Sequence, residues 1–178
     1  MQRQINIMTW DESFLELYRR CVAIYQEGNN DFHSYYGDAD LAFLASIGYK
    51  PRELFDFVED FVDEGVPSES AALLIAAVRR DYFQVVQNGK PSDLEVGRDE
   101  LPSFGEEIGG IAYLPRILTK ARAKLAGELH PDVMFSCGGD RKFLLEQGEI
   151  HAADFLRRVW ASDGDDQKIV DWLKGSTH

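Results

Sequence analysis

The spacing of apolar residues along the first 90 residues predicts four helices. Apolar side chains such as Phe14, Leu17 and Cys21 recur at helical intervals, and glycines follow the ends of the stretches. Asp38 or Asp40 is expected to cap the second helix, and Pro51 suits the first turn of the third. The third helix combines an aromatic inner face with an acidic outer face. The predicted helices cover 11–27, 38–48, 51–64 and 68–89.

Residues 91–104 lose this periodicity and collect Gly, Pro, Ser and Asp, which predicts a linker. Four more helices are expected beyond it, over 104–127, 140–147, 151–161 and 165–174. No β-hairpin dipeptide between alternating residues and no strand-helix-strand rhythm is recognised. The predicted fold class is therefore all-α, with two similar four-helix lobes, 1–90 and 105–178, packed as one compact unit.

The two lobes share a short pattern of residues when the chain is compared with itself at an offset of one hundred positions. Two short helices ending in glycine would share Asp, Leu and Gly for local reasons alone, but the phenylalanines and the helix order also agree. We therefore expect an internal duplication, with a cleft between the lobes lined by residues 35–40 and 137–141. The matching pairs are Asp40 and Asp140, Phe43 and Phe143, Leu44 and Leu144, Gly48 and Gly148, and Phe55 and Phe155.

The predicted helix after Gly110 carries Arg116, Lys120 and Lys124 at four-residue intervals on one face. These cations have two interpretations. They either pair with the acidic helix at 53–64 or face solvent, as charged stripes usually do, or they form a site for a carboxylate or phosphate. A guanidinium binds such groups with two parallel hydrogen bonds, which makes Arg116 the best candidate.

A small polar motif, Cys137-Gly138-Gly139-Asp140-Arg141, precedes the next predicted helix. Successive glycine amides at a helix N-terminus can hold an anion or favour the thiolate form of a neighbouring cysteine. The alternative is a tight turn in which Asp140 caps the helix and Cys137 is a small buried residue.

Composition and charge narrow the classes of protein. The chain has 178 residues, 44% of them hydrophobic, and a formal net charge of −12, which argues against a nucleic-acid or anionic-membrane partner. The N-terminus lacks the apolar core of a signal peptide, and no run is long enough to span a membrane, so a cytoplasmic location with reduced cysteines is expected. The histidines and cysteines match no zinc spacing, and the sequence predicts no metal and names no cofactor.

Residues 109–129 and 137–144, together with 151–159 and 163–173, resemble the bacterial family catalogued as domain of unknown function 5069. The resemblance covers the second half of the chain, and the basic helix is its most specific part. Members carry a Cys-Pro variant of the polar motif where this chain has Cys137-Gly138. The resemblance implies a soluble bacterial helical domain and no particular reaction.

Three functional hypotheses follow. The first is a binding protein that holds a small anionic ligand in the cleft between the lobes; its ligand-binding residues would be Arg116, Lys120, Arg141 and the amides of Gly138 and Gly139. The second is an enzyme in which Cys137 or Asp140 acts as nucleophile or acid-base group beside those cations. The third is a homodimer or interaction scaffold formed by the aromatic-rich lobes.

Overall fold

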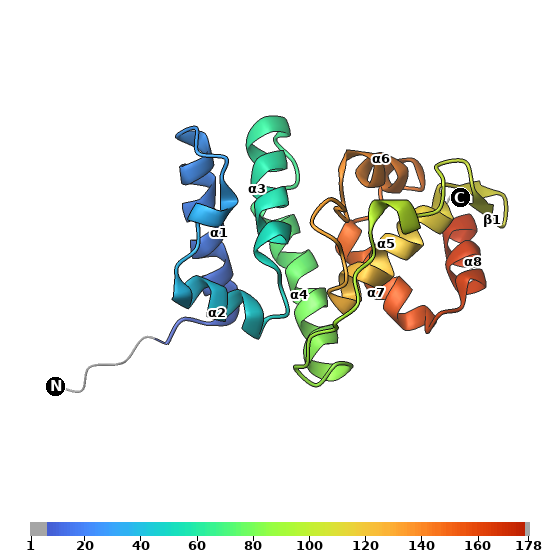
Figure 1. Ribbon diagram of the computed structural model, residues 1–178. Coiled ribbons are helices and arrows are strands. Elements are labelled where there is room, and N and C mark those ends of the chain that lie inside the picture. Colours follow the sequence, from blue (N-terminus) through green and yellow to red (C-terminus); the bar gives the residue numbers. More distant parts are fainter. Residues whose placement is uncertain (1–6, 177–178) are drawn as a thin grey trace.

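The computed structural model describes residues 7–176, and the chain between these limits is mainly helical (Figure 1). Residues 1–6, which belong to the segment considered for an export signal, and residues 177–178 lie outside the described part. The helical fold class is confirmed. The helices are α1 (Trp10–Gln26), α2 (Asp38–Ser46), α3 (Pro51–Glu64), α4 (Glu69–Val85), α5 (Leu114–Ala126), α6 (Gly138–Glu146), α7 (Ala152–Ser162) and α8 (Asp166–Ser176), with short 3-10 turns η1 (Phe32–Ser34) and η2 (Arg98–Glu100).

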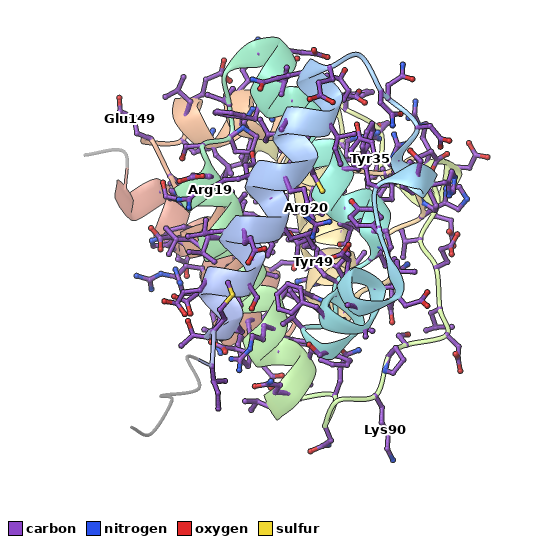
Figure 2. All side chains as sticks on the ribbon, turned by 90° about the vertical axis from the view of Figure 1, so that its left-hand side faces the viewer. Arg19, Arg20, Tyr35, Tyr49, Lys90 and Glu149 are labelled. Carbon is purple, nitrogen blue, oxygen red and sulfur yellow. The ribbon has the colours of Figure 1, made fainter. Side chains whose placement is uncertain are left out.

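Helix α4 lies in the middle of the molecule, between α1–α3 at one end and α5–α8 at the other (Figure 1). It packs against α1 on one side and against α5 and α7 on the other. One hydrophobic cluster runs through both halves, so they share a core. When the molecule is viewed from the first-half end, α1 lies at the front and carries Arg19 and Arg20 (Figure 2), which pair with Glu69 and Asp40.

A short antiparallel hairpin corrects the expectation that the chain contains no β-structure. Strands β1 (Glu107–Ile108) and β2 (Ile111–Ala112) are joined by Gly109 and Gly110, whose φ angles are +60° and +79°. Two consecutive positive φ angles suit a two-residue hairpin turn, and glycine adopts them without a Cβ penalty. The helix predicted from residue 104 therefore begins only at Leu114.

In the two shortest α-helices, α2 and α6, the aspartates that the sequence suggested as caps are not in the cap position, and Asp38 is the first residue of α2. The residues in the cap position are Gly37 and Cys137. Asp40 and Asp140 are instead the third residues of their helices, and their carboxylates accept hydrogen bonds from the amides of Gly37 (3.0 Å) and Ser136 (2.8 Å). Each aspartate thus fixes the turn that leads into its helix, and the expectation of Asp140 as the N-cap is wrong.

The predicted linker, 91–104, is bound to the second half of the chain. The amide of Val96 donates to the carbonyl of Glu128 at 2.6 Å, and the amide of His130 donates to the carbonyl of Val96 at 3.1 Å. These bonds form an isolated parallel bridge between Val96 and the loop that follows α5. Arg98, in η2, donates to the carbonyl of Asp132, which lies in the same loop after α5.

A buried ion pair joins α3 of the first half to α5 of the second. The Lys124 ammonium lies 3.0 Å from a Glu53 carboxylate oxygen and 3.2 Å from the Tyr49 hydroxyl, and it also lies over the Tyr49 and Phe57 rings. The side chains of Lys124 and Glu53 are only 2% and 6% exposed. Burial lowers the pKa of Lys124, while the Glu53 carboxylate opposes that shift.

A second buried cation, Arg79 of α4, joins the turn after α2 to α5 through neutral acceptors. Its guanidinium donates to the carbonyls of Gly48 and Leu125 at 2.9 and 2.7 Å, and to the side chain of Gln87 at 2.7 Å. A Cβ at Gly127, where φ is +71°, would overlap this guanidinium. Glycine at the end of α5 therefore satisfies both the left-handed backbone and the close approach of Arg79.

Asp56 of α3 gives the protein a measurable pH dependence of stability. Its side chain is 11% exposed, and burial raises its pKa to about 7, although Arg52 and Lys124 act in the opposite direction. Because an unfolded aspartate has a pKa of about 3.9, the folded state binds the extra proton between about pH 4 and 7, and stability falls as pH rises through this window. Asp56→Asn cannot titrate, so we expect its loss of unfolding free energy across this pH window to be about 2 kcal/mol smaller than that of the wild type.

Urea unfolding at pH 5 and pH 8 measures this effect as a difference in the free energy of unfolding. Asp93→Asn, the same chemical change in an exposed loop, is the matched control and is expected to keep the wild-type pH dependence. If Asp56→Asn and the wild type lose the same stability between the two pH values, Asp56 does not titrate as described.

Candidate functional site

The cations of α5 are divided among different partners. Lys124 pairs with Glu53 of the acidic helix, Lys120 pairs with Asp140, and Arg122 pairs with Asp166. Arg116 donates to the carbonyl of Pro102 at 2.8 Å. The two interpretations of the basic face therefore apply to different residues, since only Lys124 meets α3.

The Lys120–Asp140 pair is the buried centre of the second-half loops. The two charged groups are 2.6 Å apart, and their side chains are 4% and 0% exposed. The Asp140 carboxylate also accepts from the Tyr113 hydroxyl at 2.7 Å and from the Ser136 amide at 2.8 Å. Burial and the nearby carboxylate raise the pKa of Tyr113 far above its usual range, which keeps its hydroxyl a donor.

Cys137 lies at the N-terminus of α6, beside this pair. Its sulfur accepts a hydrogen bond from Lys120 Nζ at 3.2 Å, and the residue is half-buried. The amides of Gly138 and Gly139 belong to the first helical turn, and neither donates to an acceptor among residues 7–176. The half-buried sulfur of Cys137 therefore lies between a buried ammonium group and the first, unsatisfied amides of α6.

A pocket of about 280 Å³ opens next to Cys137, with Lys120 and Gly139 in its wall. Arg98 and Arg116 line it as well, and no carboxylate oxygen of the described residues lies within 4.0 Å of either guanidinium. The other lining residues are Leu101, Phe104, Tyr113, Asp132, Val133 and Met134.

Each guanidinium is held in place by neutral groups. Arg98 donates to the carbonyl of Asp132 at 2.9 Å. Arg116 lies 4.2 Å above the centre of the Phe104 ring and donates to Pro102. Several N–H groups of both side chains thus stay available, because a guanidinium has five.

The sequence-predicted site residues only partly come together. Arg116, Lys120, Cys137 and Gly139 line the pocket, whereas Gly138, Asp140 and Arg141 do not. Because Asp140 is fully buried, it acts as a positioning residue that holds the loop and the Lys120 side chain.

Arg141 is turned toward the first half of the chain. Its guanidinium donates to Asp60 at 2.8 Å, to Glu64 at 2.7 Å and to the carbonyl of Ser136 at 2.7 Å. Arg141, which was expected to bind a ligand, therefore meets the acidic outer face of α3. The acidic face of α3 was visible in the sequence, but only the tertiary structure shows that this face pairs with Arg141.

Arg98, Phe104 and Tyr113 line the pocket but were missed by sequence reasoning. Arg98 and Phe104 lie in or beside a segment interpreted as a linker, and nothing in its composition marks a binding residue. The dipeptide Gly109-Gly110 was a usable signal, because recognition of its hairpin turn would have placed Tyr113 at a helix start instead of inside a helix.

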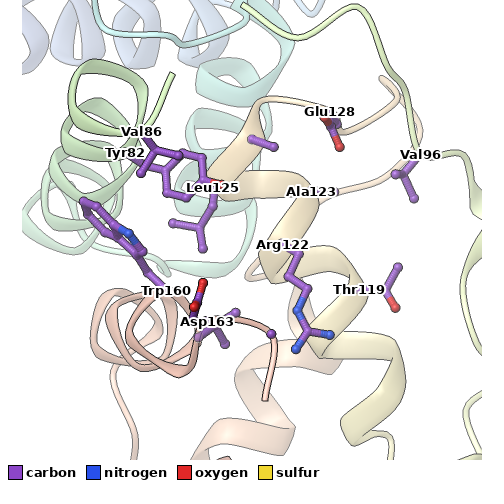
Figure 3. A pocket seen from close by; sticks show the side chains of 13 residues that line it. Tyr82, Val86, Val96, Thr119, Arg122, Ala123, Leu125, Glu128, Trp160 and Asp163 are labelled. Atoms are coloured by element: carbon purple, nitrogen blue, oxygen red, sulfur yellow. The ribbon is translucent and has the colours of Figure 1, made fainter. Parts of the chain in front are cut away.

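A different pocket, of about 600 Å³, lies between the halves where α4 faces α5 and α7 (Figure 3). Its wall includes Tyr82 and Trp160, whose ring centres are 5.4 Å apart, and the charged residues Arg122, Glu128 and Asp163. None of the sequence-predicted site residues lines it. Another pocket between the halves, of about 400 Å³, is lined by Arg141 together with residues of α4 and α6. Of the predicted ligand-binding residues, only Arg141 thus lines one of these two pockets between the halves, whereas Arg116, Lys120 and Gly139 line the pocket within the second half.

Within residues 7–176, no three His, Cys, Asp or Glu side chains form a group suited to a metal ion. No helix in this part of the chain has the length and apolar character needed to cross a bilayer.

The second half is thus mainly helical, and its cationic pocket lies beside a buried ion pair. Residues 98–178 match the family described as domain of unknown function (DUF5069), which confirms the resemblance found in this half. Comparison with curated proteins and with solved structures gives no match. All residues that line the pocket lie within the matched segment.

Proposed function

We propose that the pocket next to Cys137 binds a small anionic ligand. The observation that carries this proposal is the pair Arg98 and Arg116, two guanidiniums without a carboxylate partner in the described structure, in a chain with a net charge of −12. Other surface guanidiniums of this chain, such as Arg19, Arg20 and Arg141, pair with carboxylates. A carboxylate or phosphate would supply the missing negative charge.

The ligand's oxygens would meet two kinds of donor, guanidinium groups and a backbone amide. Arg98 and Arg116 offer bidentate hydrogen bonds, and the Gly139 amide adds the positive end of α6. Lys120 also faces the pocket, but its charge is balanced by Asp140, so it contributes mainly by holding Cys137 and the loop in place.

We also propose that the two halves arose by duplication. Helices α2 and α6 begin and end one hundred positions apart, and α1 and α5 end one hundred positions apart. The ion pairs Arg20–Asp40 and Lys120–Asp140 join the same helices at the same offset, and both measure 2.6 Å. The presence of the ion pair in both halves supports the interpretation that the pair existed before the duplication. Its role would be structural, since in each half it links the short helix to the long helix before it.

Comparison of positions one hundred residues apart then distinguishes residues that both halves share from residues found only in the second half. Arg116 corresponds to Glu16, and Cys137 corresponds to Gly37. The ion pair occurs in both halves, but a guanidinium and a thiol at these places occur only in the second. This contrast favours a binding site that belongs to the second half alone.

A thermal-shift measurement tests the binding proposal. Inorganic phosphate and acetate are expected to raise the midpoint of unfolding above that in sodium chloride of equal ionic strength, because binding to the folded state alone stabilises it. A stabilisation of 1 kcal/mol corresponds to about 2–4 °C for a chain of this size. Midpoints that depend only on ionic strength for every small anion tested would count against the proposal.

A second candidate function is catalysis with Cys137 as the nucleophile, and the contact between Lys120 Nζ and the Cys137 sulfur favours it. A thiolate is the reactive form of cysteine, and a nearby ammonium and a helix N-terminus both stabilise it. Asp140, the other catalytic candidate, would act through Lys120 and not on a substrate, since it is fully buried.

Alkylation of the folded protein tests this environment. We expect iodoacetamide to modify Cys137 and to leave Cys21 unmodified, because Cys21 is fully buried and burial raises its pKa to about 11. Cys21 is thus an internal control. The anionic reagent iodoacetate tests the local charge. At Cys137, the ratio of the iodoacetate rate to the iodoacetamide rate is expected to be higher in the folded protein than in the urea-unfolded chain, because nearby cations attract the anionic reagent.

Arg116→Ala should reduce this preference for the anionic reagent. A rate ratio at folded Cys137 equal to or below that of the unfolded chain would contradict the cationic environment. A Cys137 that resists both reagents would remove the nucleophile hypothesis.

A further inference from the structure

The cationic pocket next to Cys137 adjoins another pocket, of about 540 Å³. This neighbour, which is not the pocket between the halves, is called the second pocket below. The two pockets share three wall residues, Phe104, Tyr113 and Gly139. Beyond them the second pocket is lined by Gly110, Ile111, Ala112, Lys142, Phe143, Glu146 and Gln147. The hairpin and α6 thus form a mainly apolar extension of the site, with charged residues among those from α6.

Aromatic rings form the common wall. The Tyr113 ring stacks on Phe104 with a centroid distance of 6.0 Å and lies 5.4 Å from the Phe143 ring. Its hydroxyl is fixed by Asp140, and its backbone has a φ of +72° at the start of α5. The buried ion pair therefore holds the Tyr113 ring at the junction between the cationic and the apolar pocket.

Gly139 lies at the same junction. A Cβ at this position would stand 3.0 Å from the Tyr113 hydroxyl, closer than nearly all real Cβ contacts. The corresponding position in the first half is Ala39, so a side chain is compatible with this place in a short helix. The absence of a side chain in the second half keeps the surface between the two pockets free of an obstruction.

Phe104 completes the apolar surface. Its side chain is 67% exposed, although one of its faces is covered by the Arg116 guanidinium. A large aromatic ring held beside a cation and left open to solvent offers an apolar contact next to an anion-binding group.

From this geometry we infer that the ligand is an amphiphilic anion, with a carboxylate or phosphate head and an apolar body. The head binds Arg98 and Arg116, and the body passes over Gly139 into the pocket lined by Ile111, Ala112 and Phe143. This inference rests on the proposed anion binding and adds the class of ligand. Small inorganic anions would fill only the first pocket.

Isothermal titration calorimetry with two short series tests the inference. One series is inorganic phosphate, butyl phosphate and hexyl phosphate, and the other is acetate, butyrate and hexanoate, so the two head groups are compared separately. We expect affinity to rise with chain length in the series whose head fits, by up to about fourfold for each methylene that is buried. Hexanol, which lacks the anionic head, is expected to bind far more weakly than hexyl phosphate or hexanoate.

The wild-type series alone can overturn the inference. If phosphate or acetate binds but the alkyl members bind no more tightly, the apolar part is wrong while the proposed function stands. If none of the anions binds, the proposed function itself fails. If hexanol binds as tightly as the alkyl anions, the cationic head site is not part of recognition.

A variant locates the apolar body. Ala112→Trp places a large ring in the second pocket from the exposed strand β2, and it is expected to bring the affinity ratio of hexyl to inorganic phosphate, or of hexanoate to acetate, close to one. Arg116→Ala is expected to weaken short and long anions alike. A ratio that Ala112→Trp leaves unchanged would show that the body binds elsewhere.

Discussion

Replacement of Glu53 by alanine is expected to destabilise the protein by about 3–5 kcal/mol, because it removes the carboxylate that contacts the buried Lys124 ammonium. The cost arises from desolvation, since Lys124 is 2% exposed and only the Tyr49 hydroxyl remains as a hydrogen-bond partner. The free energy of unfolding in urea, compared with that of the wild type, measures this loss. The destabilisation should shrink at high pH, where Lys124 can lose its proton in the folded state.

Two controls separate the buried pair from a general loss of charge. Glu64→Ala removes a partner of Arg141 whose side chain is 57% exposed, and a loss below about 1 kcal/mol is expected. The double replacement Glu53→Leu with Lys124→Met removes both charges and should recover most of the stability lost in Glu53→Ala. A loss in Glu53→Ala no larger than in Glu64→Ala would contradict a buried ion pair between the halves.

Asp140→Ala is expected to have an effect of similar size, about 3–5 kcal/mol, within the second half. The carboxylate receives hydrogen bonds from Lys120, Tyr113 and Ser136, and all three donors would lose their acceptor at once. Urea unfolding measures the stability. Tyrosine fluorescence and Cys137 alkylation, which should become faster, report whether the loop opens.

The matched control lies one hundred residues earlier. Asp40→Ala removes the equivalent aspartate, but its partner Arg20 is 44% exposed and can return to water. We expect a loss of about 1–2 kcal/mol from the weakened cap and the surface pair. Equal losses in Asp40→Ala and Asp140→Ala would mean that burial does not determine the strength of the second-half pair.

The helical fold and most helix ends could be predicted from local signals. Gly28 and Gly127 follow the ends of α1 and α5, and Pro51 begins α3, each for a backbone reason that the sequence shows directly. The start of α5 was misplaced because its apolar spacing continues backward through the hairpin, where Gly109-Gly110 decides the conformation.

The site was predictable in part for a similar reason. Cys137 and Gly139 are adjacent in sequence to the start of α6, and Arg116 and Lys120 lie one helical turn apart, so their proximity follows from local structure. The choice of ion-pair partner depends on tertiary packing. No local pattern assigns Arg141 to α3 or brings the 3-10 turn at 98–100 to the pocket.

The central claim is that the unpaired guanidiniums bind an anion, and titration of inorganic phosphate into three proteins by isothermal titration calorimetry tests it most directly. The wild type is expected to bind, and Arg116→Ala is expected to bind at least tenfold more weakly, since a charge-assisted hydrogen bond contributes about 1.5–3 kcal/mol. Arg141→Ala, which removes a cation that already has its carboxylates, is expected to keep the wild-type affinity within about twofold, the spread allowed for a long-range charge effect. Equal weakening in both variants, or no binding by the wild type, would contradict the account.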